Sequence, residues 1–451
     1  MLDRLFFIAL VLNASGLFRF VAPQLGVTIG HVSMVLLALN CLYLFVKVRM
    51  AGPILLRGAM GRWTLLLWIW PIATIVYAPS FELREVGLHL YYFTLFFSTV
   101  VFTRVNGLPA IHRMLTISLI ITVIGMPLSM MAPQYFEAVA ALADAKSEEM
   151  GRPIGFFMQP NRLAISLSLM FIAWYALKPN KSAVKEVVAI VCFLGLELLT
   201  GSRAGMLVGL GIVALMIVFN WPERFARGRL LYTGGLLLVC LVVGIVGLRI
   251  YLAAVADVGN RREGDLIDRM DSIVSFRFSL EGNLAEDESL EERVETQAHY
   301  IGLVLEHPLL GHGFGANAHY LETGSIWLSA HSEALSRAFD YGVIYPVFLY
   351  LAVASLYRKR GRRELELALG TNAVAQFAAA FAVLFAYSSV MEVRVTYIVL
   401  GIVYAAVQYP RQLFAYDEVS GHLGAMLTRH DLQLRTPPEK HSGKTQEVTP
   451  E

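Results

Sequence analysis

Long, uninterrupted apolar runs constrain the fold of this chain more than any other feature of its sequence. Apolar residues make up 56% of the 451 positions and charged residues 16%, and the charged residues gather between the runs. A run of about 20 apolar residues crosses a bilayer as a helix, in which each backbone polar group finds its partner within the segment. Barrel strands are short and alternate with period two, unlike these runs. The pattern therefore predicts an all-α polytopic membrane protein.

We predict about twelve transmembrane helices, nine within residues 1–253 and three within 340–410. They lie near residues 5–22, 29–46, 63–79, 86–103, 114–132, 160–177, 187–200, 204–220, 230–253, 340–357, 367–388 and 395–409. Residues 254–339 then form one long loop. The polar tail 411–451, which contains Pro437-Pro438, is expected to be disordered.

The basic residues of the short connections predict the orientation in the membrane. They cluster in alternate connections, the last of them the run Arg358-Lys359-Arg360-Gly361-Arg362-Arg363. Because Lys and Arg are enriched on the cytoplasmic side, both termini are expected in the cytoplasm. The loop 133–159 and the long loop 254–339 are then expected on the opposite, periplasmic face. Cys41, Cys192 and Cys240 lie within apolar runs and are interpreted as buried packing residues.

The long loop is rich in acidic residues and in histidines, and it contains one clear helical pattern. Ser289-Leu290-Glu291-Glu292 has the form of a capping box, and apolar residues follow at helical spacing as far as His307-Pro308. Arg293 lies on the polar face of this helix, where an intrahelical salt bridge is the simplest interpretation. The histidine spacings match no closed zinc pattern, so we expect no metal.

Arginines on the outer face are informative because topology does not require them there. Arg203 lies in the turn Thr200-Gly201-Ser202-Arg203-Ala204-Gly205, where it either holds a phosphate group or extends along the membrane surface from a helix end. Four further candidates for ligand contact, each equally compatible with a turn or a helix start, are Arg152, Gln159, Asn161 and Arg162. Arg394, just before the last predicted span, has the same two interpretations.

His331 precedes a helix in Ser329-Ala330-His331-Ser332-Glu333. A histidine near a helix N-terminus tends to stay neutral, because the helix dipole disfavours its charged form, and it can then accept a proton. The alternative is a histidine that only caps or packs against the helix. The glycine-rich stretch 307–315 follows no strand and is interpreted as a shaped loop rather than a nucleotide site.

Taken in order, these motifs resemble those of the O-antigen ligase and O-antigen polymerase superfamily of bacterial envelope glycosyltransferases. His331-Ser332, nine residues, and then Gly342-Val343-Ile344-Tyr345 fit the ligase signature His-[Asn/Ser/Gln]-x9-Gly-x-x-[Gly/Thr/Tyr]. Other segments similar to those of the family are Gly201-Ser202-Arg203-Ala204-Gly205, residues 307–313, and the segment that ends in Gln159-Pro160-Asn161.

The resemblance implies a GT-C-type, metal-independent, inverting enzyme without a cofactor. It would move a glycan from undecaprenyl diphosphate to lipid A-core at the periplasmic face of the bacterial inner membrane. His331 would be the general base, and Arg203 and Arg293 would bind the diphosphate. Arg152, Gln159, Asn161, Arg162, Ser332, Tyr345 and Arg394 are further candidates for substrate contact. Membrane lipids are expected partners, and nucleic acids are not.

Two alternatives remain open at this point. A polymerase would join two carrier-linked glycans; the acidic long loop and the complete signature favour the ligase. A polysaccharide transporter or flippase would need internal repeats and buried charge pairs within spans, and the sequence shows neither clearly.

Overall fold

The computed structural model describes residues 1–51, 58–79, 83–142, 154–177, 183–200, 202, 205, 208–213, 288–326, 330, 332–355, 381, 391 and 393–408. Across these ranges the regular secondary structure is helical, with no strand. The helices are α1 (Leu2–Ser15), α2 (Leu17–Gln24), α3 (Ile29–Ala51), α4 (Gly58–Ala73), η2 (Thr74–Tyr77), α5 (Leu83–Met131), α6 (Pro133–Leu142), η3 (Gly155–Phe157), α7 (Pro160–Ala176), α8 (Ala183–Leu199), α12 (Glu288–Glu306), α13 (Ala316–Glu322), α14 (Glu333–Tyr341), α15 (Ile344–Ser355) and α18 (Arg394–Gln408).

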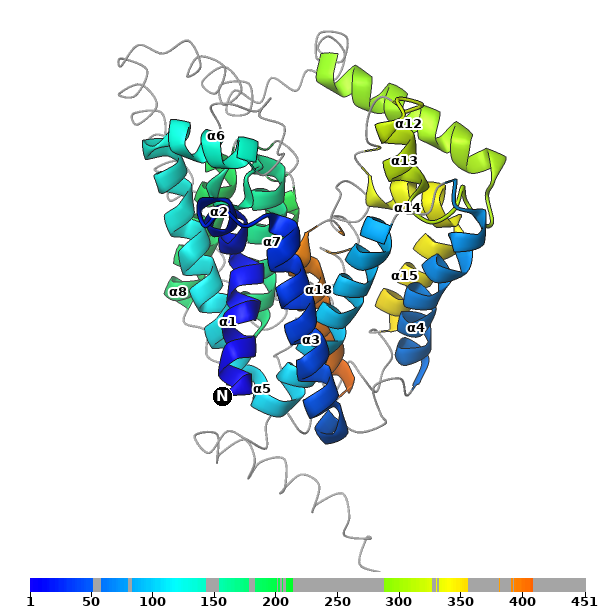
Figure 1. Ribbon diagram of the computed structural model, residues 1–451. Helices are drawn as coiled ribbons and strands as arrows, with labels where there is room; N and C mark the ends of the chain where they lie inside the picture. Colours follow the sequence, from blue (N-terminus) through cyan, green and yellow to red (C-terminus); the bar gives the residue numbers. More distant parts are fainter. Residues whose placement is uncertain are drawn as a thin grey trace, which may run out of the picture.

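The long helices stand side by side in a bundle, with the chain's N-terminus at one end and α12, α13 and α14 at the other (Figure 1). Large apolar side chains are exposed on the outside of this bundle, among them Phe45 at 81% and Val35 at 68%. An apolar exterior suits contact with lipid rather than water. Two described helices, α3 over residues 29–47 and α5, are long and apolar enough to cross a membrane, and the bent pair of α1 and α2 makes a third if it counts as one span. The total of twelve spans remains a prediction.

Helix α5 is 49 residues long but is bent at Gly107, which has φ 74° and ψ 176°. Both of its ends lie at the α12–α14 end of the bundle. Arg84, near the start, faces Glu322 of α13 at 4.0 Å, and Ser129, near the end, accepts a hydrogen bond from the backbone N–H of Gly155 at 3.2 Å. The two arms of α5 therefore leave the bend in the same direction, and the predicted spans 86–103 and 114–132 fall one in each arm.

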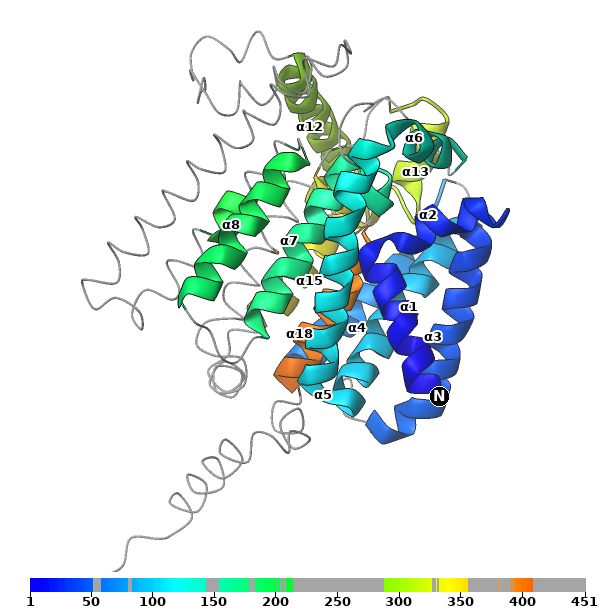
Figure 2. The same cartoon turned by 90° about the vertical axis from the view of Figure 1, so that its left-hand side faces the viewer.

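The predicted first span, 5–22, is broken. Helix α1 ends at Ser15, the chain turns at Gly16, and α2 leaves at an angle of 96°. Figure 2 shows α2 lying across the outer end of α1, beside the top of the bundle. The bend is packed against η3, since a Cβ on Gly16 would lie 3.0 Å from the carbonyl oxygen of Phe156. Residues 17–24 are thereby turned across the bundle end instead of continuing through it.

The long loop contains helices where the sequence predicts one. Helix α12 ends at Glu306, directly before His307-Pro308 as expected, but it begins at Glu288, so Ser289 lies inside its first turn rather than at the cap. A break at Gly342 separates α14 from α15. The predicted span 340–357 therefore begins at Ile344, the start of α15, and not at residue 340.

The cysteine prediction is wrong for the two cysteines that the structure describes. Cys41 and Cys192 are free and exposed on the outer surface of their helices, where a small apolar side chain suits a lipid-facing position as well as a packed one. The predicted spans 230–253 and 367–388, most of 204–220, and the tail 411–451 lie outside the described residues, except for residue 381.

Candidate functional site

Arg394 lies at the start of α18, inside the bundle, and is 5% exposed. Its Nη1 donates to Asn13 Oδ1 at 3.1 Å and to Tyr91 Oη at 3.0 Å, and its Nη2 donates to Ser33 Oγ at 2.7 Å. The guanidinium also lies 3.9 Å from the ring centre of Phe18 and 4.6 Å from that of Tyr91. Because all these partners are neutral, they orient the guanidinium without cancelling its charge.

Two further arginines stand near Arg394. Arg19, in the first turn of α2, lies close enough to Arg394 and to Arg162, in the first turn of α7, for its positive charge to be repelled by both. Within the described residues neither Arg19 nor Arg394 forms an ion pair with a carboxylate. Like charges gathered in a half-buried place are unfavourable unless an anion joins them. We call Arg19, Arg162 and Arg394 the arginine cluster.

The N-terminus of α7 adds backbone donors beside this cluster. Gln159 is its N-cap residue and makes no side-chain capping bond, and Pro160 occupies the first helical position. A helix start attracts negative charge through its first N–H groups and the helix dipole. Asn161, the next residue, accepts a hydrogen bond from Ser202 Oγ at 2.9 Å. Ser202 is the direct neighbour of Arg203, so the predicted turn lies against the start of α7.

The same turn packs against a buried carboxyl group. Glu197 in α8 is 0% exposed and accepts a hydrogen bond from Ser168 Oγ at 2.7 Å. A Cβ on Gly205 would lie 2.9 Å from Glu197 Oε2, so the chain passes Glu197 closely at this point. The sequence places Glu197 near a span edge but does not identify it as buried.

Helix α14 carries the residues that follow His331. Ser332 is its N-cap residue, and Ser332 Oγ accepts a hydrogen bond from the backbone N–H of Leu335 at 3.4 Å. This gives a physical reason for the second signature position, since Ser and Asn are preferred N-cap residues. Ser332 is buried and caps the helix, and its contact with substrate stays a prediction. Glu333 follows and accepts a hydrogen bond from the backbone N–H of Met391 at 3.0 Å, three residues before Arg394.

The glycine-rich stretch holds the other end of α14 by backbone hydrogen bonds. His312 N–H donates to Phe339 O at 2.8 Å, Gly313 N–H to Asp340 O at 2.9 Å, and Val343 N–H to Pro308 O at 2.8 Å. A Cβ on Gly342, whose φ is 75°, would lie 2.0 Å from Leu309 O. The glycine of the signature is therefore required by this close approach. The interpretation of the stretch as a shaped loop agrees with these contacts.

Tyr345, the last signature position, is 7% exposed and lines an apolar cavity of about 60 Å³ between α4, α5, α15 and α18. The cavity is walled by large side chains such as Trp68, Phe96 and Tyr397, and Met391 also borders it. Tyr345 thus packs in the core of the bundle, and its contact with substrate stays a prediction.

The three principal candidates are located only through their neighbours. Arg203 and His331 lie outside the described residues, and Arg293 lies in α12 with its side chain outside them. Arg152, a secondary candidate, lies outside them as well. Their neighbours nevertheless converge. Ser202 contacts Asn161, the neighbour of Arg162 in the chain, and Glu333 contacts Met391, three residues before Arg394. Arg19 lies near both Arg162 and Arg394. Ser202 and Glu333 are thus each joined to a segment that carries a member of the arginine cluster.

Sequence reasoning missed Arg19, which it placed within an unbroken first span. The signal available was an arginine three residues after Ser15-Gly16 in an otherwise apolar run, a pattern that suits a helix break with the charge at a membrane surface. In the described part of the chain, no three His, Cys, Asp or Glu side chains gather as metal ligands. Metal independence stays a prediction.

The arrangement combines gathered positive charge with the start of a helix, which together suit a polyanion such as a diphosphate. Residues 188–350 match the family described as O-Antigen ligase. This match covers the turn at residue 203, the long loop and the complete signature, and it confirms the resemblance seen in the sequence. A comparison with curated proteins gives no match.

Proposed function

We propose that this chain, whose residues 188–350 match the O-antigen ligase family, transfers O-antigen glycan from undecaprenyl diphosphate to lipid A-core. The match supports an O-antigen ligase-type protein. The family supports a glycosyltransferase-like enzyme and a membrane protein. The proposal adds the donor, the acceptor and the periplasmic face of the inner membrane, with both termini in the cytoplasm and a GT-C-type architecture of about twelve spans.

The observation that carries the proposal is the arginine cluster beside the start of α7. A glycan-linked diphosphate must be held while negative charge builds on its departing oxygen, and positively charged groups already in place stabilise that charge. Arg203 and Arg293 are proposed to bind the diphosphate, with Arg162 and Arg394 in support. Arg152, Gln159 and Asn161 are proposed as secondary substrate contacts. The arginines supply the positive charge, so the proposal needs neither a metal nor a cofactor.

His331 is proposed as the general base. It takes the proton of the acceptor hydroxyl while that oxygen attacks the anomeric carbon, and the bond from this carbon to the diphosphate oxygen breaks. The products are the glycan joined to the acceptor with inverted configuration, undecaprenyl diphosphate, and a protonated His331. Assistance of this kind contributes roughly 10²–10⁴-fold to a rate, so His331→Ala should lower transfer by a factor in that range.

A deletion strain examined on a lipopolysaccharide gel tests the function most directly. Loss of a ligase leaves bare core and accumulates carrier-linked polymer. Loss of a polymerase leaves core with at most one repeat unit, and that result would replace the ligase proposal with its alternative. In a purified assay, activity that a chelator abolishes and a divalent ion restores would contradict metal independence. The family match favours an enzyme over a transporter.

A further inference from the structure

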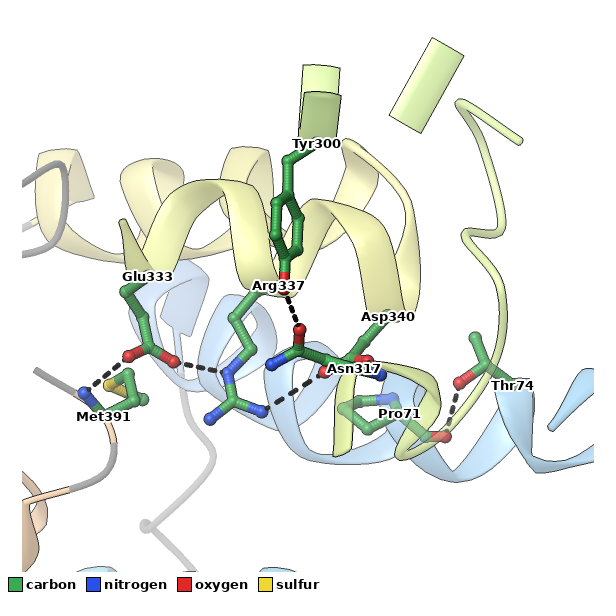
Figure 3. Close-up of polar contacts among 8 residues, drawn as sticks. All are labelled: Pro71, Thr74, Tyr300, Asn317, Glu333, Arg337, Asp340 and Met391. Carbon is green, nitrogen blue, oxygen red and sulfur yellow. Dashed lines mark hydrogen bonds and ion pairs between the residues drawn. The ribbon is translucent and has the colours of Figure 1, made fainter. Parts of the chain in front are cut away.

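A chain of polar contacts joins α12, α13, α14 and residue 391 (Figure 3). Tyr300 Oη donates to Asn317 Oδ1 at 2.5 Å, and the backbone N–H of Asn317 donates to Asp340 Oδ1 at 2.7 Å. Asp340 Oδ2 lies 3.8 Å from Nη1 of Arg337, which in turn donates from Nε to Glu333 Oε1 at 2.5 Å. Glu333 closes the chain with its bond to Met391. None of these residues was singled out by the sequence.

Within this series of polar contacts, Glu333 links α14 to the segment at residue 391. Its side chain is 2% exposed, and its two oxygens point in different directions, one to Arg337 and one to the backbone of Met391. The second bond joins residues 58 positions apart, from the start of α14 to the segment that leads into α18. One carboxylate therefore holds the helix that begins two residues after His331 to the segment that carries Arg394.

Burying the charges of Glu333 and Arg337 lowers the stability of the fold unless another interaction compensates for it. Burial of a carboxylate and a guanidinium carries a desolvation penalty, and an apolar pair of similar volume often gives equal or greater stability. Arg337 is held on its other side by Asp340, so the guanidinium is fixed in two directions and Glu333 has little freedom. Buried, fully partnered polar networks of this kind rigidify the groups that they connect.

We infer that Glu333 is a positioning residue, which fixes the segment bearing His331 relative to the segment bearing Arg394. It touches neither substrate nor reacting atoms and acts through Arg337 and Met391. The inference rests on the proposed function for the roles of His331 and Arg394. Glu333 would support catalysis by keeping the base and the charged group in position. A displacement of such groups by about 1 Å can lower the reaction rate about 100-fold.

Two substitutions of Glu333 distinguish its bond to Arg337 from its bond to Met391. Glu333→Ala removes both bonds, whereas Glu333→Gln keeps an oxygen for the Met391 N–H and loses the charge. The control is Glu322→Ala, because the one ion pair of Glu322 among the described residues is an exposed contact of 4.0 Å with Arg84. The full-length proteins are compared in lipid nanodiscs by hydrogen exchange at residues 391–394 and by transfer from an undecaprenyl diphosphate-linked glycan to lipid A-core.

We expect Glu333→Ala to speed exchange at residues 391–394 at least about tenfold, since the bond protecting the Met391 amide is gone. Its kcat per folded molecule should fall about 100-fold with the KM for the donor within about threefold, because alignment rather than binding is lost. Glu333→Gln should keep the wild-type exchange rate and recover part of kcat. Glu322→Ala should change neither.

Unchanged exchange at residues 391–394 in Glu333→Ala would overturn the inference, and this readout does not depend on any reaction. Faster exchange with an unchanged kcat per folded molecule would also overturn it, since the bond would then serve stability alone. If the wild-type protein transfers no glycan, the proposed function fails and the catalytic part of the inference fails with it, while the exchange result still decides whether Glu333 joins the two segments.

Discussion

Arg394 keeps its positive charge inside the bundle because the side chains around it are neutral. Three hydrogen bonds to Asn13, Tyr91 and Ser33 and two aromatic rings fix its guanidinium but supply no negative charge. An arginine has five N–H donors, so donors remain for a ligand beyond the three bonds described. Arg19 is half-buried, and is thus more accessible than Arg394.

Arg19 should therefore contribute directly to anion binding. We expect Arg19→Ala to weaken binding of inorganic diphosphate by roughly tenfold, the equivalent of about 1.4 kcal/mol, because a charge-assisted hydrogen bond is lost. Titration calorimetry on the protein in nanodiscs measures this, with the exposed Arg62→Ala as the matched control. Equal affinities in the two variants would remove Arg19 from the cluster's function.

Asp340 makes the stability of the protein depend on pH. Burial raises the pKa of Asp340 to about 7, although the nearby Arg337 acts to lower it. The folded protein therefore binds a proton at a pH where the unfolded chain, with its carboxyl pKa near 3.8, does not. The resulting stabilisation is complete below pH 3.8 and is lost as the pH rises through about 7.

The unfolding temperature should consequently fall between pH 5 and pH 8, and Asp340→Asn should flatten this dependence because the amide does not titrate. Thermal unfolding in detergent at several pH values measures both. A slope as steep in Asp340→Asn as in the wild type would assign the effect to another group.

At the scale of elements, the apolar runs predict the helices well, because burial against lipid and neighbouring helices depends on a local pattern. Helices α7 and α18 begin and end within a few residues of the predicted limits. The bend at Gly16 and the break at Gly342 were missed, since both depend on contacts with distant backbone. The bond from Glu333 to Met391 spans 58 residues, a distance over which local periodicity carries no information.

Replacing Gly342, at the junction between α14 and α15, tests how tightly this junction is packed, and Gly324 serves as the control position. Gly342 and Gly324 both have positive φ, at 75° and 72°, but a Cβ on Gly342 would meet Leu309 O whereas one on Gly324 meets open space. Gly324→Ala should cost about 1–2 kcal/mol from its backbone conformation alone. Gly342→Ala adds a backbone clash and should cost more than about 3 kcal/mol. Equal losses in unfolding temperature would show that the junction can open without penalty.

At the scale of the whole molecule, the arginine cluster and the start of α14 lie toward the end of the bundle opposite the chain's N-terminus (Figure 1). The sequence predicts this polarity through its basic connections. It could not predict that Arg394 at the start of α18 meets Asn13, Ser33 and Tyr91, or that Glu333 at the start of α14 meets Met391, because these contacts join segments far apart in the sequence.

The orientation can be measured by labelling single cysteines. In a variant without Cys41, Cys192 and Cys240, we expect Glu306→Cys to react with a membrane-impermeant maleimide from the periplasmic side. Arg4→Cys, at the opposite end and also exposed, should react only after the inner membrane is opened. The reverse pattern would place the arginine cluster on the cytoplasmic face and contradict the proposed donor chemistry.

The backbone bonds between residues 308–313 and 339–343 impose a rotational phase on α14. They fix the last turn of the helix without using side chains. Each residue advances an α-helix by about 100°, so an insertion or deletion between Ser332 and Gly342 would swing the N-terminal end of α14 around its own axis. The interval of nine residues in the signature is thus an angle as well as a length.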